Sequence, residues 1–329
     1  MILRHIIGNI LPYGITKCYL ERKMKNKEKN GSSSSFGVEL IPIYINSTPN
    51  DEEPKNKEKV YISDYNYNPK CRDSLQKSKI GDILNKWFVD NKSEIVVLVK
   101  KICSFEYFYE KIPIESSEDG IAKWDNPWIP PFDAISIYGF VATKNPRYYV
   151  EVGSGNTTMF AAQAIHDNNL RTKIISIDPH PREEIDKICY KIYRMPLEDM
   201  DSNFFSTLSA DDILLIDNSH RSFPNSDVTV FFTEILPVLP TGILYTLHDI
   251  FLPMDYPEIW SNEQKRWYNE QYLLCAYLLG GANGDKIKFP NAFLGTKDDI
   301  FMACDSLWGK GNLLENKKFG GGFFWMEKA

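Results

Sequence analysis

Histidine and aspartate residues follow two short apolar runs in the second half of the chain. Asp217 and His220 follow the run 213–216 within the segment DNSH, and His248 and Asp249 follow the run 243–247. Because parallel strands end at the same edge of a sheet, we expect these four side chains to converge. A histidine can accept a hydroxyl proton near neutral pH, so His220 is the first candidate base and His248 the second, with Asp249 beside them. The alternative is a pair of structural histidines that hydrogen-bond backbone carbonyls.

The same segments contain a candidate metal site. Asp217 and Asp249 offer carboxylate oxygens, the ligands that Mg²⁺ prefers, and a bound cation would lower the pKa of a hydroxyl group and orient it. No third carboxylate is evident beside the first loop. Magnesium dependence therefore stays open, since water and substrate also supply oxygen ligands.

A glycine turn follows an earlier run. Residues 148–152 lead into Gly153-Ser154-Gly155, and a helix is expected over 159–165. Glycines let the backbone approach a ligand, and the start of a helix offers free N–H groups. The next run ends at Asp178, where a carboxylate can accept hydrogen bonds from both ribose hydroxyls. The alternative for Asp178 is a turn residue before Pro179.

Regular alternation of apolar runs with helical segments begins near residue 147. The runs 148–152, 174–177, 213–216 and 243–247 are typical of strands buried on both faces, and 323–326 is a candidate last strand. The pattern predicts an α/β fold with a doubly wound, mostly parallel Rossmann-like sheet and an N-terminal helical or irregular extension. We expect a basic segment and linker over 1–35, an accessory region over 36–120 and a cofactor-binding domain over 121–329.

The segment EVGSG at 151–155 and the acidic end of the second strand resemble the class I S-adenosylmethionine-dependent methyltransferases. The resemblance implies that an acidic residue at Glu151 holds the methionine end of the cofactor and that Asp178 binds its ribose. It also implies that Glu198 or Asp199, after a third strand over 192–197, lies near the adenine. The cofactor-binding residues implied are Glu151, Gly153, Ser154, Gly155, Thr157, Asp178, Glu198 and Asp217.

Two other functions remain open. A nicotinamide-dependent oxidoreductase has the same fold class, but Thr158 stands where the GxGxxG pattern needs its third glycine. The other alternative is a non-catalytic scaffold of glycan-assembly enzymes that binds a partner through its N-terminal region.

The DNSH and HD segments resemble bacterial methyltransferases that modify sugars of antibiotics and surface glycans, some of which use magnesium. That resemblance implies an O-methyltransferase acting on a sugar hydroxyl of a capsule or lipopolysaccharide glycan or its precursor. Trp124 and Trp128, in the proline-rich segment 124–133, and Tyr256, after the fifth strand, are the candidate substrate contacts; Asp133 could bind hydroxyls. Packing in the core is the alternative for the aromatic residues.

Composition narrows the choice of partners. A net charge of −6 and a pI of about 5.5 argue against a broad nucleic-acid surface, and six cysteines without metal-site spacing are typical of reduced thiols. We expect a cytoplasmic protein, since no apolar run is long enough to cross a bilayer and the first residues lack the pattern of a signal peptide. Residues 1–30 carry seven basic and two acidic residues, which would suit contact with the inner membrane face and a lipid-linked acceptor. A frayed terminus is the alternative, and the oligomeric state is open.

Overall fold

The computed structural model describes residues 41–42, 59–60, 71–116, 118, 120–264 and 266–329. The chain divides into two units. In one, residues 1–43 and 55–68, the described part is an antiparallel pair of short strands, β1 (Ile41–Pro42) and β2 (Lys59–Val60). The predicted basic segment and linker, 1–35, lie outside the described residues. The other unit, residues 44–54 and 69–329, contains every other described element.

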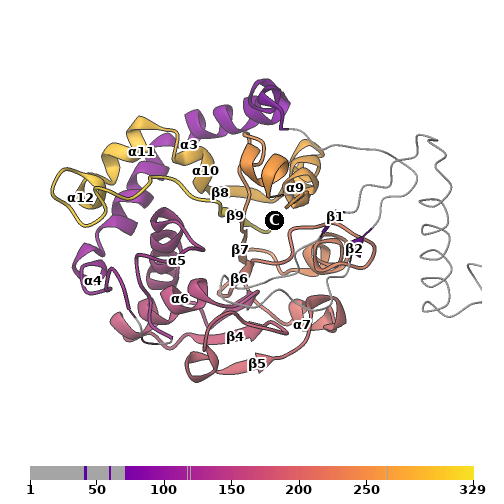
Figure 1. Ribbon diagram of the computed structural model, residues 1–329, viewed down its shortest axis with the longest axis horizontal. Coiled ribbons are helices and arrows are strands. Elements are labelled where there is room, and N and C mark those ends of the chain that lie inside the picture. Colours follow the sequence, from indigo (N-terminus) through magenta and orange to yellow (C-terminus); the bar gives the residue numbers. More distant parts are fainter. Residues whose placement is uncertain (1–40, 43–58, 61–70, 117, 119, 265) are drawn as a thin grey trace, which may run out of the picture. The chain divides into compact units, whose positions relative to one another are not determined.

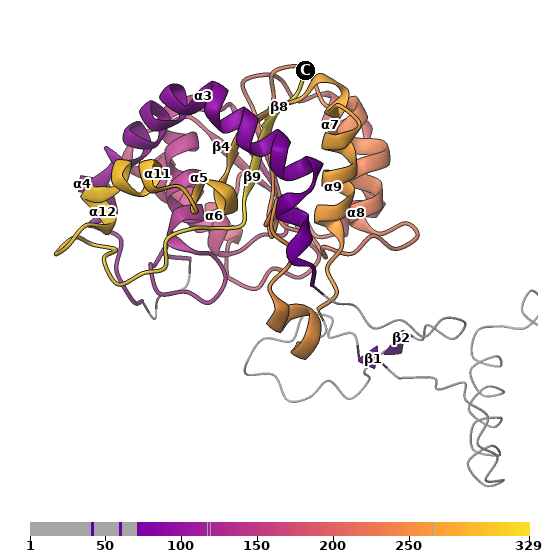
Figure 2. The same ribbon diagram turned by 90° about the horizontal axis from the view of Figure 1, so that it is seen from above.

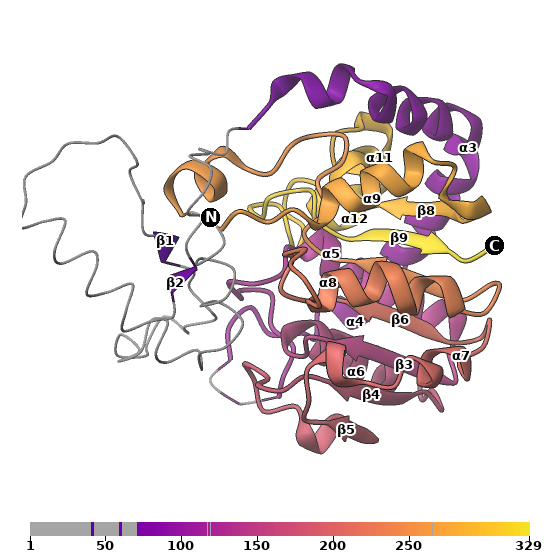
Figure 3. The same cartoon turned by 90° about the vertical axis from the view of Figure 1, so that its right-hand side faces the viewer.

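A seven-stranded sheet forms the centre of the second unit, in the order β5-β4-β3-β6-β7-β9-β8 (Figures 1 and 3). Strand β9 runs antiparallel to both its neighbours, and the others are parallel to one another. The strands are β3 (Tyr148–Val152), β4 (Lys173–Ile177), β5 (Lys191–Tyr193), β6 (Ile213–Ile216), β7 (Leu244–Leu247), β8 (Lys286–Pro290) and β9 (Phe324–Glu327). This arrangement confirms the predicted doubly wound, Rossmann-like fold class.

Two strands differ from the sequence expectation. The third predicted strand, 192–197, ends at Tyr193, because Pro196 precedes a 3₁₀ turn over Leu197–Asp199. Strand β8 was not predicted, since its exposed Lys286 and its Pro290 are unusual in a strand interior; it lies at the sheet edge, where both are tolerated.

Helices cover both faces of the sheet. Figure 2 shows α5 and α6 on one side of the strands and α7, α8 and α9 on the other, while α3 crosses over the β8 end of the sheet and contacts both α5 and α9. The α-helices are α3 (Lys79–Cys103), α4 (Glu106–Tyr109), α5 (Pro131–Lys144), α6 (Asn156–Asp167), α7 (Asn203–Ser206), α8 (Asp227–Val230), α9 (Glu270–Leu279), α10 (Asn291–Leu294), α11 (Asp298–Ala303) and α12 (Asp305–Trp308). Short 3₁₀ and π turns are η1 (Asp73–Lys77), η2 (Asp186–Ile188), η3 (Leu197–Asp199), η4 (Phe231–Ile235), η5 (Leu236–Val238), η6 (Ile259–Glu263) and η7 (Ala282–Gly284). No described helix is both long enough and apolar enough to span a bilayer.

Helix α3 packs its apolar stripe on the same core as the sheet. Its inward residues recur at helical spacing, and Leu84, Val99 and Ile102 are at most 1% exposed. A Cβ added at Gly139 of α5 would lie 2.7 Å from a side-chain carbon of Ile102, so the two helices approach closely there. The described core therefore extends on both sides of the boundary expected near residue 121.

The loops after β3 and β6 touch at the carboxyl edge of the sheet. Gly153 has a φ of +78°, and a Cβ at this position would lie 1.7 Å from the backbone oxygen of Asp217. Both the left-handed conformation and the missing side chain are therefore required. The turn brings the glycine loop directly against the loop that carries Asp217 and His220.

Candidate active site

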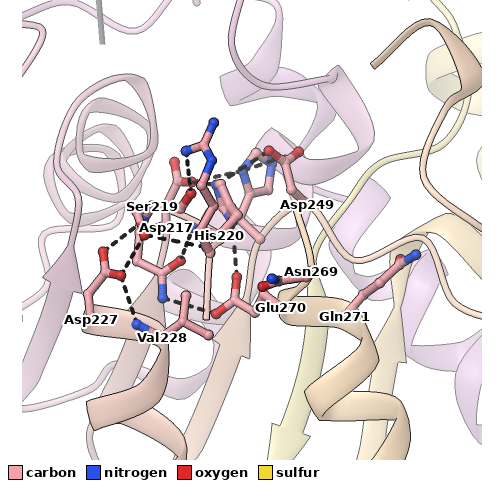
Figure 4. A network of polar contacts seen from close by, with 12 residues as sticks. Asp217, Ser219, His220, Asp227, Val228, Asp249, Asn269, Glu270 and Gln271 are labelled. Carbon is pink, nitrogen blue, oxygen red and sulfur yellow. Dashed lines mark hydrogen bonds and ion pairs between the residues drawn. The ribbon is translucent and has the colours of Figure 1, made fainter. Parts of the chain in front are cut away.

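A cluster of carboxylates and histidines lies at the carboxyl edge of the sheet (Figure 4). The ring of His220 joins three acidic residues, because its Nδ1 lies 3.0 Å from Glu270 Oε2 and its Nε2 lies 3.2 Å from Asp217 Oδ1 and 3.4 Å from Asp249 Oδ2. His220 and Glu270 are almost completely buried. The loops after β6 and β7 thus meet at one imidazole, as the sequence predicts, but Glu270 at the start of α9 was not foreseen.

His248 extends the same cluster. Its Nδ1 lies 3.2 Å from Asp217 Oδ1, the oxygen that also faces His220, and 3.9 Å from Asp249 Oδ1. Its Nε2 lies 3.4 Å from Asp133 Oδ2 but without hydrogen-bond alignment. We refer to Asp133, Asp217, His220, His248, Asp249 and Glu270 as the acidic cluster.

Asp133 differs from the expectation that it binds substrate hydroxyls. It is fully buried on α5, and its carboxylate accepts hydrogen bonds from Asn291 Nδ2 (2.6 Å), the Gly322 backbone N–H (2.7 Å) and the Phe323 backbone N–H (3.1 Å). A Cβ at Gly321 would lie 2.0 Å from Asp133 Oδ1. Asp133 therefore fixes the segment before β9 against α5, and it faces the Nε2 side of the His248 ring.

Charge in the acidic cluster shifts the pKa of each partner. Burial opposes the charged form of both rings, but Asp217, Asp249, Glu270 and Asp133 outweigh it and raise the pKa values of His220 and His248 well above 6.5. Burial likewise opposes ionisation of Asp217, yet the two histidines hold its pKa well below the usual range. At neutral pH the arrangement thus consists of imidazolium rings between carboxylates.

Backbone conformation marks two of these residues. His220 has a φ of +59° and Asp249 a φ of +53°, in the left-handed region that residues other than glycine adopt uncommonly, with asparagine, aspartate and histidine the most frequent among them. The His220 carbonyl accepts hydrogen bonds from the backbone N–H groups of Asn269 (2.9 Å) and Glu270 (3.3 Å). These bonds hold the strained turn on the start of α9, and such strain is typical of functional sites.

The glycine loop is held by Asp178 at the end of β4. Asp178 Oδ2 accepts the Ser154 N–H (2.7 Å), and Oδ1 accepts the His180 N–H (2.7 Å). Glu151 is fully buried in β3; Thr157 donates to its Oε1, whereas its Oε2 has no hydrogen-bond partner. Burial, together with the charges of Asp217 and Asp178, raises the pKa of Glu151 to about 8.

Comparison with known proteins identifies the fold family of this site. Residues 150–250, which include the glycine loop and both loops of the acidic cluster, match the family model described as a methyltransferase domain. This chain contains a class I S-adenosylmethionine-dependent methyltransferase domain. A search of curated protein sequences finds no match.

Solved structures similar to the chain include three from different organisms. The branched-chain polyamine synthase of Thermus thermophilus is 10% identical over 69% of this chain and 63% of its own, with a TM-score of 0.36, so the chain spans less than two thirds of its length. The O-methyltransferase TomG of Streptomyces achromogenes is 10% identical over 70% of this chain and 89% of its own (TM-score 0.36). The methyltransferase PaMTH1 of Podospora anserina is 14% identical over 76% and 95% (TM-score 0.37).

The residues of the methyltransferase domain fit the cofactor that the family implies. The unpartnered Glu151 Oε2 offers a buried acceptor for an ammonium group, and the Gly153 turn leaves no side chain over the end of β3. Each Asp178 oxygen accepts one backbone N–H and retains a lone pair for a hydroxyl group. Glu198, predicted near the adenine, is exposed on η3.

The same test gives a different result for magnesium. Within the described ranges, no group of three or more His, Cys, Asp or Glu side chains is arranged to hold a metal ion. The predicted ligands, Asp217 and Asp249, both face His220 Nε2, so an imidazole already lies between them. As arranged, these residues do not fit a metal site.

The predicted substrate contacts have different surroundings. Trp124 is 2% exposed, donates to the Tyr109 carbonyl and packs on Phe160, so the structure gives it a packing role. Trp128 is half-buried beneath the Arg182 guanidinium, whose Cζ lies 4.2 Å from the ring centre. Tyr256 is 4% exposed among the aromatic residues before α9, and its hydroxyl accepts the Gln271 N–H (3.1 Å).

Proposed function

We propose that the methyltransferase domain methylates a hydroxyl oxygen, and that the acceptor is a sugar of a bacterial surface glycan or of its precursor. The observation that carries the oxygen acceptor is the position of His220. Its ring lies at the carboxyl edge of the sheet beside the glycine loop. Nδ1 contacts the buried Glu270, and Nε2 faces the carboxylates of Asp217 and Asp249. Such a unit can orient a hydroxyl group and take its proton.

Residues of the chain divide the remaining tasks. When bound, S-adenosylmethionine supplies a methyl group on a positive sulfonium, and the acceptor oxygen gains this methyl as the sulfur–carbon bond breaks. Glu151 would hold the cofactor's ammonium group and Asp178 its ribose. Asp217 and Asp249 keep negative charge at the edge where the positive cofactor enters, which favours binding.

The acceptor proton goes to the acidic cluster. In its neutral form, His220 accepts the proton at Nε2, while Glu270 fixes the ring through Nδ1 and stabilises the imidazolium that forms. Because the carboxylates raise the pKa of His220, the neutral fraction grows as the pH rises above 6.5. His248, which shares Asp217 with His220, is the second candidate for this role.

Magnesium would be an alternative activator of the hydroxyl in a different arrangement of the acidic cluster, because His220 would first have to leave its place between Asp217 and Asp249.

The N-terminal segment bears on where the acceptor is found. The basic residues within 1–30 would suit binding of a cytoplasmic protein to the anionic inner membrane face, where lipid-linked sugars are found.

The test begins with calorimetric titration of S-adenosylmethionine, S-adenosylhomocysteine and NAD into the full chain. We expect the first two to bind and NAD to give no heat, with Asp178→Asn weakening both sulfur ligands. Binding of NAD alone would favour the oxidoreductase, and binding of none would favour the scaffold.

The second stage offers methyl-labelled S-adenosylmethionine with a panel of free, nucleotide-linked and lipid-linked sugars, with peptides and amines as controls. We expect label on a sugar oxygen; label on peptide or amine nitrogen alone would contradict the proposal. Activity that survives a chelator and does not rise with added magnesium would exclude the metal role.

A further inference from the structure

Two arginines lie beside the acidic cluster on a shared aromatic ring. Tyr268 packs on His220 with ring centres 4.6 Å apart, and the Arg221 Cζ lies 4.9 Å from the same Tyr268 centre. The Arg266 Cζ lies 5.9 Å from Tyr268 and 4.2 Å from the centre of Trp260. Two guanidinium groups are therefore next to the imidazole proposed to receive the acceptor proton.

The Arg221 guanidinium is held in place by backbone oxygens, one of which belongs to Arg266. Arg221 Nε donates to the Arg266 carbonyl (3.0 Å), and its Nη1 donates to the Ser219 carbonyl (3.0 Å). Between Arg266 and Tyr268, Trp267 has a φ of +47°, which is unusual for so bulky a residue. Asn269 joins the two loops, because its Oδ1 accepts the Ser222 N–H at 2.6 Å. Hydrogen bonds thus fix the Arg221 side chain, whereas the Arg266 guanidinium lies over the rings of Trp260 and Tyr268.

Neither guanidinium has a counter-ion in the described part of the chain. No described carboxylate lies within 4.0 Å of Arg221 or Arg266, although both are half-buried. Asp227, the acidic residue near Arg221, is occupied by hydrogen bonds from Ser219 N–H (2.8 Å), Ser219 Oγ (2.6 Å) and Val228 N–H (2.8 Å).

Electrostatics at this place are unfavourable without a ligand. Burial, together with the charge of Arg266, lowers the pKa of Arg221, although Tyr268 and Asp227 oppose the shift. By contrast Arg147, which directly precedes β3 at the amino edge of the sheet, forms an ion pair with Asp212 at 2.8 Å. Half-buried charges without a partner are costly, so a site that keeps two of them is suited to an anion.

We propose that Arg221 and Arg266 bind a phosphate or diphosphate group carried by the methyl acceptor, an inference that rests on the proposed function of His220. Two guanidinium groups match the double negative charge of a phosphate, and their forked N–H groups match its oxygens. Because Tyr268 touches both His220 and Arg221, the anion and the reacting hydroxyl belong to one molecule. The acceptor is then a phosphate-linked sugar rather than a finished neutral glycan.

The test uses pyrophosphate as the probe, titrated into the full chain saturated with S-adenosylhomocysteine at constant ionic strength without magnesium. We expect Arg221→Gln and Arg266→Gln each to weaken pyrophosphate binding at least fivefold, since a charged hydrogen bond contributes about 1.5–3 kcal/mol. The matched control is Arg171→Gln, which removes the same charge from an exposed position, and it should bind as the wild type does.

Further ligands identify the source of the anion. Uridine diphosphate that binds more tightly than pyrophosphate would indicate a nucleotide-linked sugar, and geranyl diphosphate that does so would indicate a lipid-linked sugar; both support the site. Glucuronate binding more tightly than pyrophosphate would overturn the phosphate assignment.

Failure of this inference differs from failure of the proposed function. The anion site alone is overturned if the chain binds S-adenosylhomocysteine but does not bind pyrophosphate. The same holds if pyrophosphate binding is unchanged in the variant that carries both Arg221→Gln and Arg266→Gln. Pyrophosphate binding is therefore also measured without S-adenosylhomocysteine. If the chain binds pyrophosphate through the arginines but does not bind S-adenosylhomocysteine, the anion site stands and the proposed methyl transfer is contradicted.

Discussion

Two buried charged networks lie at opposite edges of the same sheet, and they are built differently. At the amino edge, Asp285 Oδ1 accepts Lys328 Nζ at 2.9 Å, and its Oδ2 accepts the hydroxyls of Tyr245 (2.7 Å) and Tyr277 (2.9 Å). One oxygen of this buried carboxylate thus faces a cation, and the other accepts hydrogen bonds from neutral donors. Such a network is complete without a ligand.

The acidic cluster at the carboxyl edge lacks this balance. Four carboxylates face only two imidazoles there, His220 and Asp249 have left-handed backbone conformations, and Glu151 Oε2 nearby has no partner. The comparison teaches that excess negative charge and backbone strain occur where the chain binds a positive cofactor. Where a network serves stability alone, its charges are balanced by partners within the protein.

The largest expected effect follows from removing the imidazole of the acidic cluster. His220→Asn keeps a residue type that tolerates positive φ but removes the base, so methyl transfer to the acceptor that the labelling experiment identifies should fall about 10²–10⁴-fold. Calorimetry should show S-adenosylmethionine affinity within a few-fold of wild type. Turnover that is unchanged would exclude His220 as the base.

The pH profile sharpens this test. A base must be neutral, and the carboxylates raise the pKa of His220 well above 6.5. The wild-type kcat/KM should therefore fall as pH decreases through a value above 6.5, because the ring becomes protonated. A profile that stays level down to pH 5 would assign proton removal to a group other than either histidine.

The balanced network should respond in stability instead of activity. Asp285→Asn leaves Lys328 charged and buried, which should lower the free energy of unfolding by about 3–5 kcal/mol. Cofactor affinity of the folded variant should remain within twofold of wild type. Asp298→Asn, an exposed change of the same kind on α11, is the control for denaturant unfolding and should shift stability by less than about 0.5 kcal/mol. A stability loss no larger than that of Asp298→Asn would show that the amino-edge pair is not structural.

The sequence predicted the residues on strand ends better than those that reach the site from elsewhere. Asp217, His220, His248 and Asp249 converge because parallel strands place their carboxyl ends together, which periodicity reveals. Glu270 was missed, since it begins a helix whose packing depends on the loop of His220, and no local pattern encodes that contact.

Trp124 shows the opposite limit. A tryptophan in a proline-rich segment has the composition of a ligand wall, and only the positions of Tyr109 and Phe160, set by two separate helices, place its ring in the core. Side-chain depth is a tertiary property, so the residue type could not decide between the two roles.

An intermediate effect is expected at Glu151, which belongs to the glycine-loop side of the unbalanced edge. Its folded pKa of about 8 exceeds the usual value of 4.5, so its contribution to stability is present at low pH and is lost as pH rises towards and through 8. Glu151→Gln should therefore be more stable than wild type by about 1–3 kcal/mol at pH 9 and nearly equal near pH 5.

The same substitution should weaken the cofactor. Loss of a charged hydrogen bond to the ammonium group lowers S-adenosylmethionine affinity about 10–100-fold. Thermal unfolding at the two pH values and calorimetry check the pair of effects. A variant that is less stable at pH 9 and binds normally would place Glu151 with the structural network instead.

The smallest effect is a proton released on binding. At pH 7 the free protein holds Glu151 largely protonated, because its pKa is about 8, and an ammonium group beside Oε2 would favour the carboxylate. Binding should then release close to one proton, about 0.9 from this group at pH 7, seen as a dependence of the binding enthalpy on the ionisation enthalpy of the buffer. Glu151→Gln should remove this dependence while binding remains measurable at higher ligand concentration. An equal buffer dependence in both proteins would assign the proton to another group of the acidic edge, and Glu151 would then be a carboxylic acid that stays neutral in the complex.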